Sequence, residues 1–316
     1  MLLKPQKFGP NPKRLPKGKS FMTVCIAALA ADSKTIVCVA DKALSYGDYF
    51  QWDSDSTKII RLESRGMAIL ISGGEVGISK VLSALSAREE DLGESVSETT
   101  KICEMEYKKA LDELVEAKFL APRLITRAEY IHAISGPSIN PYFKQIAEEI
   151  DKFDMDCTLL LCGFDKNREP FILDLSNPGI VSDMTRTGFQ SIGSGWDKAN
   201  SRLLFSEYKR SHSVEQVLYE VFDAKANAEL EAHVGYEWDA LVLIRPPISF
   251  CDIPKNIKEL TEKVWAKANR SPFERYNRKE HLEPPPKDWR QRLKDLIELQ
   301  VLAHLAKLEA EAGEKT

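Results

Sequence analysis

Two continuous apolar runs near the start of the chain predict a buried β-hairpin. Residues 23–31 and 35–40 are almost wholly apolar, and the polar turn Asp32-Ser33-Lys34 separates them. β-Branched residues within the runs and turn-forming residues between them are typical of two antiparallel strands. Because the apolar positions are continuous and do not alternate with polar ones, we expect both faces of these strands to be covered.

The pattern that follows predicts alternating groups of strands and helices. Residues 58–62 and 67–72 predict a second hairpin, which Gly73-Gly74 ends before a helix begins. Apolar spacing further predicts helices through 76–85, 96–119, 196–208 and 213–231, and strands at 157–162, 171–175, 187–192 and 240–244. This order predicts an α+β fold in which two sheets pack face to face with helices outside.

Two segments interrupt or precede this pattern. Residues 120–150 contain several prolines between short helical pieces, and we interpret them as an insertion. Residues 1–21 are basic and proline-rich, but they lack the apolar stretch of a secretory signal, so we expect them to be disordered. The main domain is therefore expected to span residues 22–250.

Residues 251–316 form a polar C-terminal extension with helical character. Helices are predicted near 256–269 and 288–311, and Pro284-Pro285-Pro286 between them forms a stiff spacer. The last helix carries an apolar stripe of Leu293, Ile297, Val301, Leu305 and Leu308. We expect that stripe to dock on the protein's own core or on a neighbouring subunit.

Composition excludes several classes of function. The 316 residues are 43% hydrophobic, which is ample for a core, and no apolar run approaches the roughly 18 residues of a membrane helix. A net charge of −4, from 44 basic and 48 acidic residues, favours neither nucleic acid nor an anionic membrane as a partner. The six cysteines have no C-x-x-C spacing, which indicates a reducing cytoplasm without disulfides.

No cofactor site is predicted. The five histidines do not cluster at metal-ligand spacing, so we expect neither zinc nor haem. Phosphate-binding glycine patterns are also absent from the sequence, and any dependence on ATP would come from a partner.

The candidate chemistry lies in the first hairpin and just beyond it. Thr23 follows a methionine, Asp41 ends the second predicted strand, and Lys58 begins the third. An N-terminal threonine combines nucleophile and base, because its own α-amine can take the hydroxyl proton. Lys58 would supply positive charge beside the hydroxyl, and Asp41 would hold that lysine. The alternative is that the three residues have no catalytic role. Thr23 would then be an ordinary strand residue, Asp41 an acid at the end of a strand and Lys58 an exposed lysine.

These motifs together resemble the β-subunits of the proteasome and their bacterial relatives, which are N-terminal-nucleophile (Ntn) hydrolases. In that family a threonine, an aspartate, a lysine, a glycine-rich turn and a Gly-Ser-Gly turn follow one another in this order. Here they correspond to Thr23, Asp41, Lys58, Gly73-Gly74 and Gly193-Ser194-Gly195. The resemblance covers roughly residues 22–250 and implies a four-layer αββα sandwich that assembles with copies of itself.

The resemblance also implies roles for two further residues. Gly73 matches the position whose backbone N–H points at the developing oxyanion, and Ser194 matches the serine that hydrogen-bonds near the threonine amine. Each also has a simpler explanation, as a tight strand-to-helix turn and as a helix-start residue. Cys25 is a rival nucleophile that would require cleavage after Val24.

One element departs from the family pattern. Active members carry a later Asp-x-x-Ser-Gly stretch, whereas this chain reads Glu231-Ala232-His233-Val234-Gly235. The acid is a glutamate and the serine is replaced by valine. This departure puts activity in doubt without disturbing the fold.

The N-terminal tail leaves the state of Thr23 open. Residues 1–21 could be a propeptide removed before Thr23, an extension upstream of a true start at Met22, or a retained tail that keeps Thr23 internal. Only the first two release the amine that the chemistry needs.

Three functions follow as hypotheses. The first is a cytoplasmic, homo-oligomeric threonine hydrolase that cleaves amide bonds, with peptides as the expected substrate and an unfoldase as an unidentified partner. The second is a non-catalytic scaffold subunit, and the third is an amidase acting on a small molecule.

Overall fold

The computed structural model describes residues 23–46, 50–53, 57–136, 139–229, 234–246 and 250–269 of the chain, with backbone alone at 43–46, 50–53 and 267–269. Four sequence predictions lie outside the described residues. They are the disordered tail at 1–21, the first part of the departing element at 231–233, the spacer at 284–286 and the last helix at 288–311.

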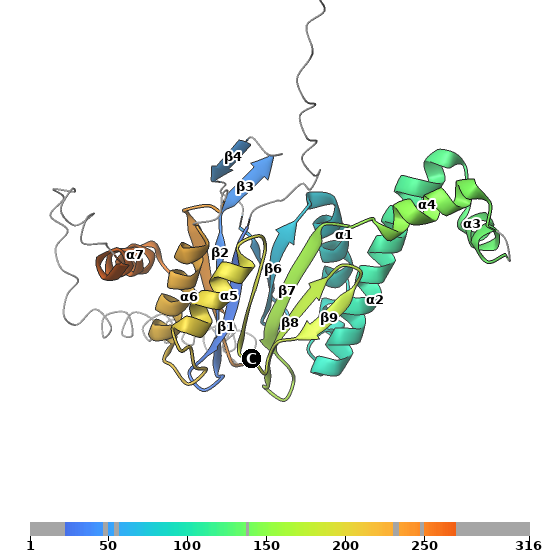
Figure 1. Ribbon diagram of the computed structural model, residues 1–316. Coiled ribbons are helices and arrows are strands. Elements are labelled where there is room, and N and C mark those ends of the chain that lie inside the picture. Colours follow the sequence, from blue (N-terminus) through green and yellow to red (C-terminus); the bar gives the residue numbers. More distant parts are fainter. Residues whose placement is uncertain are drawn as a thin grey trace, which may run out of the picture.

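Two five-stranded antiparallel sheets form the centre of the protein (Figure 1). The first sheet has the order β10-β1-β2-β11-β12 and comprises β1 (Cys25–Ala30), β2 (Thr35–Asp41), β10 (Phe189–Ile192), β11 (Trp238–Ile244) and β12 (Phe250–Asp252). The second sheet has the order β5-β6-β7-β8-β9 and comprises β5 (Ile59–Leu62), β6 (Met67–Gly73), β7 (Cys157–Phe164), β8 (Pro170–Ser176) and β9 (Ile180–Asp183). A separate two-stranded ribbon of β3 (Ala43–Tyr46) and β4 (Phe50–Asp53) follows β2.

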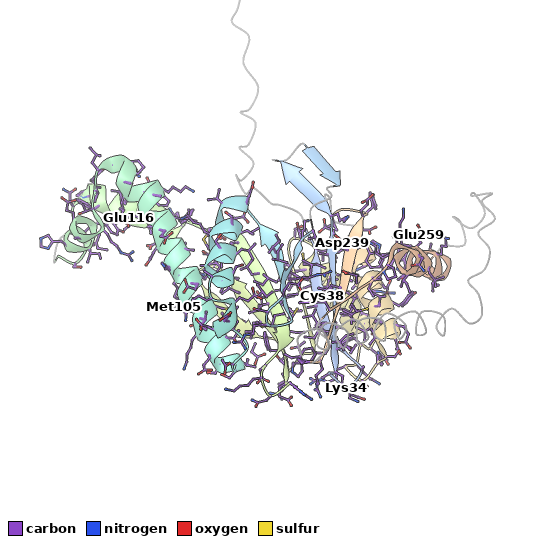
Figure 2. All side chains as sticks on the ribbon, turned by 180° about the vertical axis from the view of Figure 1, so that it is seen from behind. Lys34, Cys38, Met105, Glu116, Asp239 and Glu259 are labelled. Atoms are coloured by element: carbon purple, nitrogen blue, oxygen red, sulfur yellow. The ribbon has the colours of Figure 1, made fainter. Side chains whose placement is uncertain are left out.

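The first hairpin is buried on both faces, as its continuous apolar sequence predicts. Every residue of β1 and β2 is buried. Successive side chains of a strand point to opposite faces of the sheet. Cys25, Ala27 and Leu29 lie in the cluster between the sheets, whereas Ile26 and Ala28 lie in the cluster beneath helices. Cys38 of β2 lies near the centre of the molecule in Figure 2.

Helices cover the outward face of each sheet. The helices α1 (Glu75–Ser86) and α2 (Val96–Val115) pack on the second sheet, and α5 (Trp196–Phe205) and α6 (Val214–Ala228) pack on the first. A further helix, α7 (Lys255–Asn269), packs against α6. The helices α1, α2 and α5 each bury one side against a neighbour, whereas α6, which contacts the first sheet, α5 and α7, is buried over most of its surface.

A helical arm projects from the sheets beyond the end of α2 (Figure 1). A π-helical turn at Glu116–Leu120 leads from α2 into the arm, which holds α3 (Arg127–Ile134) and α4 (Pro141–Asp151). Glu116 marks this transition in Figure 2. Short helices in this region confirm the helical pieces predicted from the proline spacing.

The sequence pattern missed four short strands. They are β3, β4, β9 and β12, of which β9 is largely exposed and β12 is only three residues long. An exposed edge strand has no buried face to impose an apolar alternation, so pattern analysis does not detect it. The helix predicted at 213–231 is also shorter, since α6 ends at Ala228.

Candidate functional site

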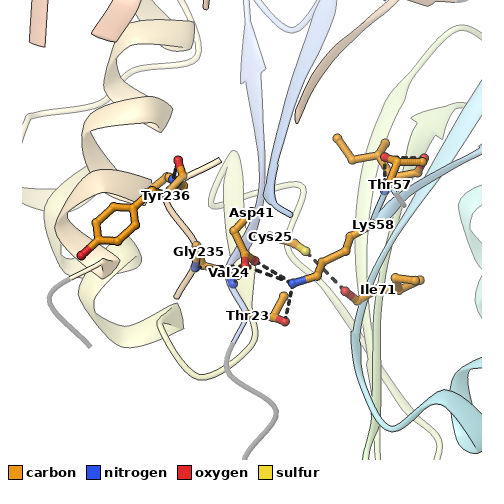
Figure 3. Close-up of polar contacts among 11 residues, drawn as sticks. Thr23, Val24, Cys25, Asp41, Thr57, Lys58, Ile71, Gly235 and Tyr236 are labelled. Carbon is orange, nitrogen blue, oxygen red and sulfur yellow. Dashed lines mark hydrogen bonds and ion pairs between the residues drawn. The ribbon is translucent and has the colours of Figure 1, made fainter. Parts of the chain in front are cut away.

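Three polar side chains from distant parts of the sequence meet at one end of the two sheets (Figure 3). The Lys58 ammonium group donates to the Thr23 hydroxyl oxygen at 2.7 Å and to the two Asp41 carboxylate oxygens at 3.0 and 3.1 Å. All three residues are buried, with exposed fractions of 5% for Thr23, 0% for Asp41 and 6% for Lys58. The structure therefore brings together the three residues that the sequence selects as candidate chemistry.

The strand register explains why these residues meet. Thr23 lies two residues before the start of β1 and Asp41 is the last residue of β2, so both lie at the same end of one hairpin. Lys58 directly precedes β5, at the edge of the other sheet. The lysine therefore reaches across the space between the sheets to the hydroxyl and the carboxylate.

Two backbone amides also contact Asp41. The Val24 amide donates to one carboxylate oxygen at 2.9 Å, and the Gly235 amide donates to the other at 3.2 Å. Together with the Lys58 ammonium group, these donors compensate a carboxylate that has no solvent contact. Sequence analysis missed both amides, because a backbone donor leaves no residue-type signal.

The turn before α5 wraps closely around the backbone of Thr23. Gly193 has a φ of +92°, and a Cβ atom there would overlap the Thr23 carbonyl oxygen. The Gly195 amide approaches the same carbonyl oxygen at 3.3 Å. A glycine is required at position 193 both by its backbone angle and by this close approach.

Ser194, in the middle of this turn, has a hydroxyl group that is buried and makes no hydrogen bond to any described residue. A buried hydroxyl without a partner costs free energy, so such a group calls for an explanation. A protonatable amine on Thr23 would be a suitable partner, but the predicted role of Ser194 stays a prediction.

Gly73 ends β6, and only Gly74 separates it from α1. Its φ is +120°, and an added Cβ atom would overlap the Asp156 carbonyl oxygen, which also accepts from the Gly74 amide at 2.5 Å. These contacts explain why a glycine is needed at position 73: it allows a tight turn from the strand into the helix, which is the simpler of the two explanations. The oxyanion role of its N–H stays a prediction.

The rival nucleophile, Cys25, is poorly suited to attack. Its side chain is fully buried and its thiol contacts the Ile71 carbonyl oxygen at 3.4 Å. Burial raises the pKa of the Cys25 thiol well above its ordinary value, which disfavours the thiolate.

Val234 and Gly235, the described residues of the Glu231-to-Gly235 stretch that departs from the family pattern, are buried in the core. Val234, which stands where the family has serine, is buried in the apolar cluster beneath α5 and α6. The next residue, Gly235, nevertheless places its amide on Asp41. The loss of the serine thus leaves the backbone support of the acid in place.

The described residues show no further metal or membrane feature. No group of three or more His, Cys, Asp or Glu side chains among them could hold a metal ion. None of the helices in the described ranges is long and apolar enough to cross a bilayer.

Comparison with known proteins shows similarity in fold alone. No family model matches the sequence, and no curated protein matches it. Among solved structures, Anbu (ancestral beta-subunit) from Yersinia bercovieri matches with a TM-score of 0.56 at 12% sequence identity, covering 83% of this chain and 100% of that one. This likeness supports a proteasome-like fold for the protein.

Proposed function

We propose that the protein is a threonine-type amidohydrolase of the Ntn kind, with a four-layer αββα sandwich and a peptide as its expected substrate. The observation that carries the proposal is the contact of 2.7 Å between the Lys58 ammonium group and the Thr23 hydroxyl, with Asp41 behind the lysine. A buried cation beside a hydroxyl stabilises the alkoxide character that develops during attack.

The base in this mechanism is the Thr23 α-amine. Lys58 already donates to the hydroxyl and is paired with a buried carboxylate, so it does not serve as the proton acceptor. A free amine on the same residue takes the hydroxyl proton, directly or through a water, as Oγ forms a bond to the carbonyl carbon. The Gly73 amide would donate to the resulting oxyanion, and the Ser194 hydroxyl would orient the amine.

Breakdown of the intermediate completes the first half of the cycle. The C–N bond breaks, the departing amine takes the proton from the α-ammonium group, and an ester on Thr23 remains. Water then attacks the ester with the α-amine again accepting a proton, which releases the acid and restores the hydroxyl.

This chemistry requires that Thr23 become the first residue. In the full chain, Met22 acylates the Thr23 nitrogen. Translation from Met22 followed by methionine removal, or cleavage of a propeptide, would release the amine. Of these routes, only propeptide cleavage requires a proteolytic cut within a longer precursor.

The test compares a chain that begins at Met22 with the full chain. Each is analysed by intact mass and N-terminal sequencing, then treated with a peptide epoxyketone, which reacts with both the hydroxyl and the free amine of an N-terminal threonine. We expect the shorter chain to begin at Thr23 and to gain one label, and its Thr23→Ala variant to gain none. A chain with a free Thr23 that neither takes the label nor cleaves peptide or small amide substrates would contradict the proposal.

A non-catalytic scaffold subunit is the second candidate. It is favoured by the buried Val234 in place of a serine and by the residues that precede Thr23. Under this hypothesis the protein from its native cell retains Met1 or Met22, takes no label and still forms an oligomer by analytical ultracentrifugation. Turnover of small amides without turnover of peptides would instead favour the small-molecule amidase.

A further inference from the structure

A second buried lysine lies behind the Thr23 site. Lys225 of α6 is completely buried. Its ammonium group donates to the Glu229 carboxylate at 2.5 Å and to the Tyr236 carbonyl oxygen at 2.6 Å. None of the motifs in the sequence analysis includes this residue.

The Tyr236 carbonyl belongs to the segment that supports Asp41. Gly235, the preceding residue, donates its amide to Asp41, and both residues lie beside Asp41 in Figure 3. The Tyr236 side chain is 76% exposed and does not anchor the segment. Lys225 therefore holds the backbone one residue away from the amide that contacts the acid.

The described segment is fixed at three points. Val234 packs in the apolar cluster, Lys225 holds the Tyr236 carbonyl, and the Glu237 carbonyl accepts from the Lys42 amide at 2.9 Å. Of these, Lys225 is the one that uses a buried side-chain charge. An apolar side chain of similar length would avoid the cost of desolvating the ammonium group.

Charged groups from three elements face Lys225. They are Glu229 directly after α6, Asp41 of β2 and Glu262 of α7. Burial lowers the pKa of the Lys225 ammonium group, and these negative charges oppose that shift. The lysine thus contributes to the charge balance around Asp41 as well as holding the segment.

We infer that Lys225 is a positioning residue of the Thr23 site, which keeps the Gly235 amide on Asp41 and so keeps Asp41 aligned with Lys58. This inference rests on the proposed function for its effect on catalysis. The positioning itself is a structural property that can be measured without any activity.

The experiment uses chains beginning at Met22 that carry Lys225→Met, Lys225→Arg or, as a matched control, Lys209→Met. Lys209 is exposed and lies on the loop before α6. Two quantities are measured for each: hydrogen exchange of the peptide that contains residues 234–236, and the rate of epoxyketone labelling as a function of pH.

For Lys225→Met we expect exchange in this peptide to be about tenfold faster and labelling about tenfold slower, as for the loss of one hydrogen bond to a charged group. Removing a cation near the site favours the protonated Thr23 amine, so the labelling profile moves to higher pH. Lys225→Arg, which retains the charge, should restore part of both rates and the original profile. Lys209→Met should match the unsubstituted chain.

Two results would overturn the inference. One is unchanged exchange in folded Lys225→Met, which would show that the lysine does not hold the segment. The other is slower labelling with an unchanged pH profile and no recovery in Lys225→Arg, which would indicate packing alone.

Failure of the proposed function is distinguishable from either result. If the unsubstituted chain takes no label, the hydrolase proposal fails, while hydrogen exchange still decides whether Lys225 positions the segment.

If Lys225→Met does not fold, Glu229→Gln provides the test, because this variant keeps the contact between Lys225 and the Tyr236 carbonyl. Exchange like that of the unsubstituted chain supports the inference, and rapid exchange in Glu229→Gln overturns it.

Discussion

Two of the polar contacts between the sheets of this protein differ in how their carboxylates are compensated. In one contact, Lys58 beside the second sheet reaches Asp41 of the first. In the other, Gln190 of the first sheet donates to Asp174 of the second at 2.6 Å. Only the first of these two contacts contains a cation.

The two carboxylates differ in their hydrogen-bond partners. Both oxygens of Asp41 accept from Lys58 and from a backbone amide. In Asp174, one oxygen is buried without a hydrogen bond to any described residue, and burial raises the pKa of its carboxyl group. Burial thus favours the neutral form of the Asp174 carboxyl group, which faces an amide and no cation.

Lys58→Met should produce the largest effect, because it removes the cation that contacts the buried Asp41 carboxylate. We expect a loss of about 3–5 kcal/mol in the free energy of unfolding, as found when one partner of a buried pair is removed. Labelling of Thr23 should fall below detection. Urea unfolding checks the first result, with Lys166→Met, an exposed lysine paired with Glu94, as a control that should leave stability unchanged.

Asp41→Asn should cost less, about 2–3 kcal/mol, because the amide keeps the volume and part of the hydrogen bonding. It removes the anion opposite Lys58, so epoxyketone labelling should also decline steeply. Stability and labelling equal to those of the unsubstituted chain would show that the charge of Asp41 contributes to neither.

Asp174→Asn should act in the opposite direction and stabilise the protein at pH 7 by about 1 kcal/mol, since it replaces a carboxyl group whose charged form is disfavoured by burial with an uncharged amide. Below the pKa of the unfolded chain, Asp174 is protonated in both states and has no penalty. As the pH rises, the unfolded chain ionises first and the native protein loses stability, until the pH exceeds the raised folded pKa. Urea unfolding from about pH 3 to pH 8 should show the advantage of Asn growing with pH. An advantage that is constant over this range would contradict the assignment.

Ser194→Ala should have the smallest effect on stability, below about 0.5 kcal/mol, because the hydroxyl has no partner among the described residues to lose. In a chain with a free Thr23, labelling should nevertheless slow, since the proposed partner of Ser194 is the amine. Equal labelling rates for Ser194→Ala and the unsubstituted chain would assign the serine to the turn alone.

The sequence by itself determined the main strands and the three candidate residues Thr23, Asp41 and Lys58. The continuous apolar runs of the first hairpin predicted burial on both faces, and the strand boundaries placed Thr23 and Asp41 at one end of it. Such features are local, because burial and turns restrict residue type within a few positions. Edge strands such as β9 escaped prediction because exposure removes that restriction.

Only the tertiary structure decided how the site is held together. The Gly235 amide reaches Asp41 across 194 positions of sequence, and the Lys225 ammonium group holds the adjacent carbonyl. Backbone donors and acceptors are the same for almost every residue type, so their partners appear only when the chain has folded. The same holds for the two carboxylates. The sequence has an aspartate at both 41 and 174, and only the folded structure shows that a lysine faces Asp41 and a glutamine faces Asp174.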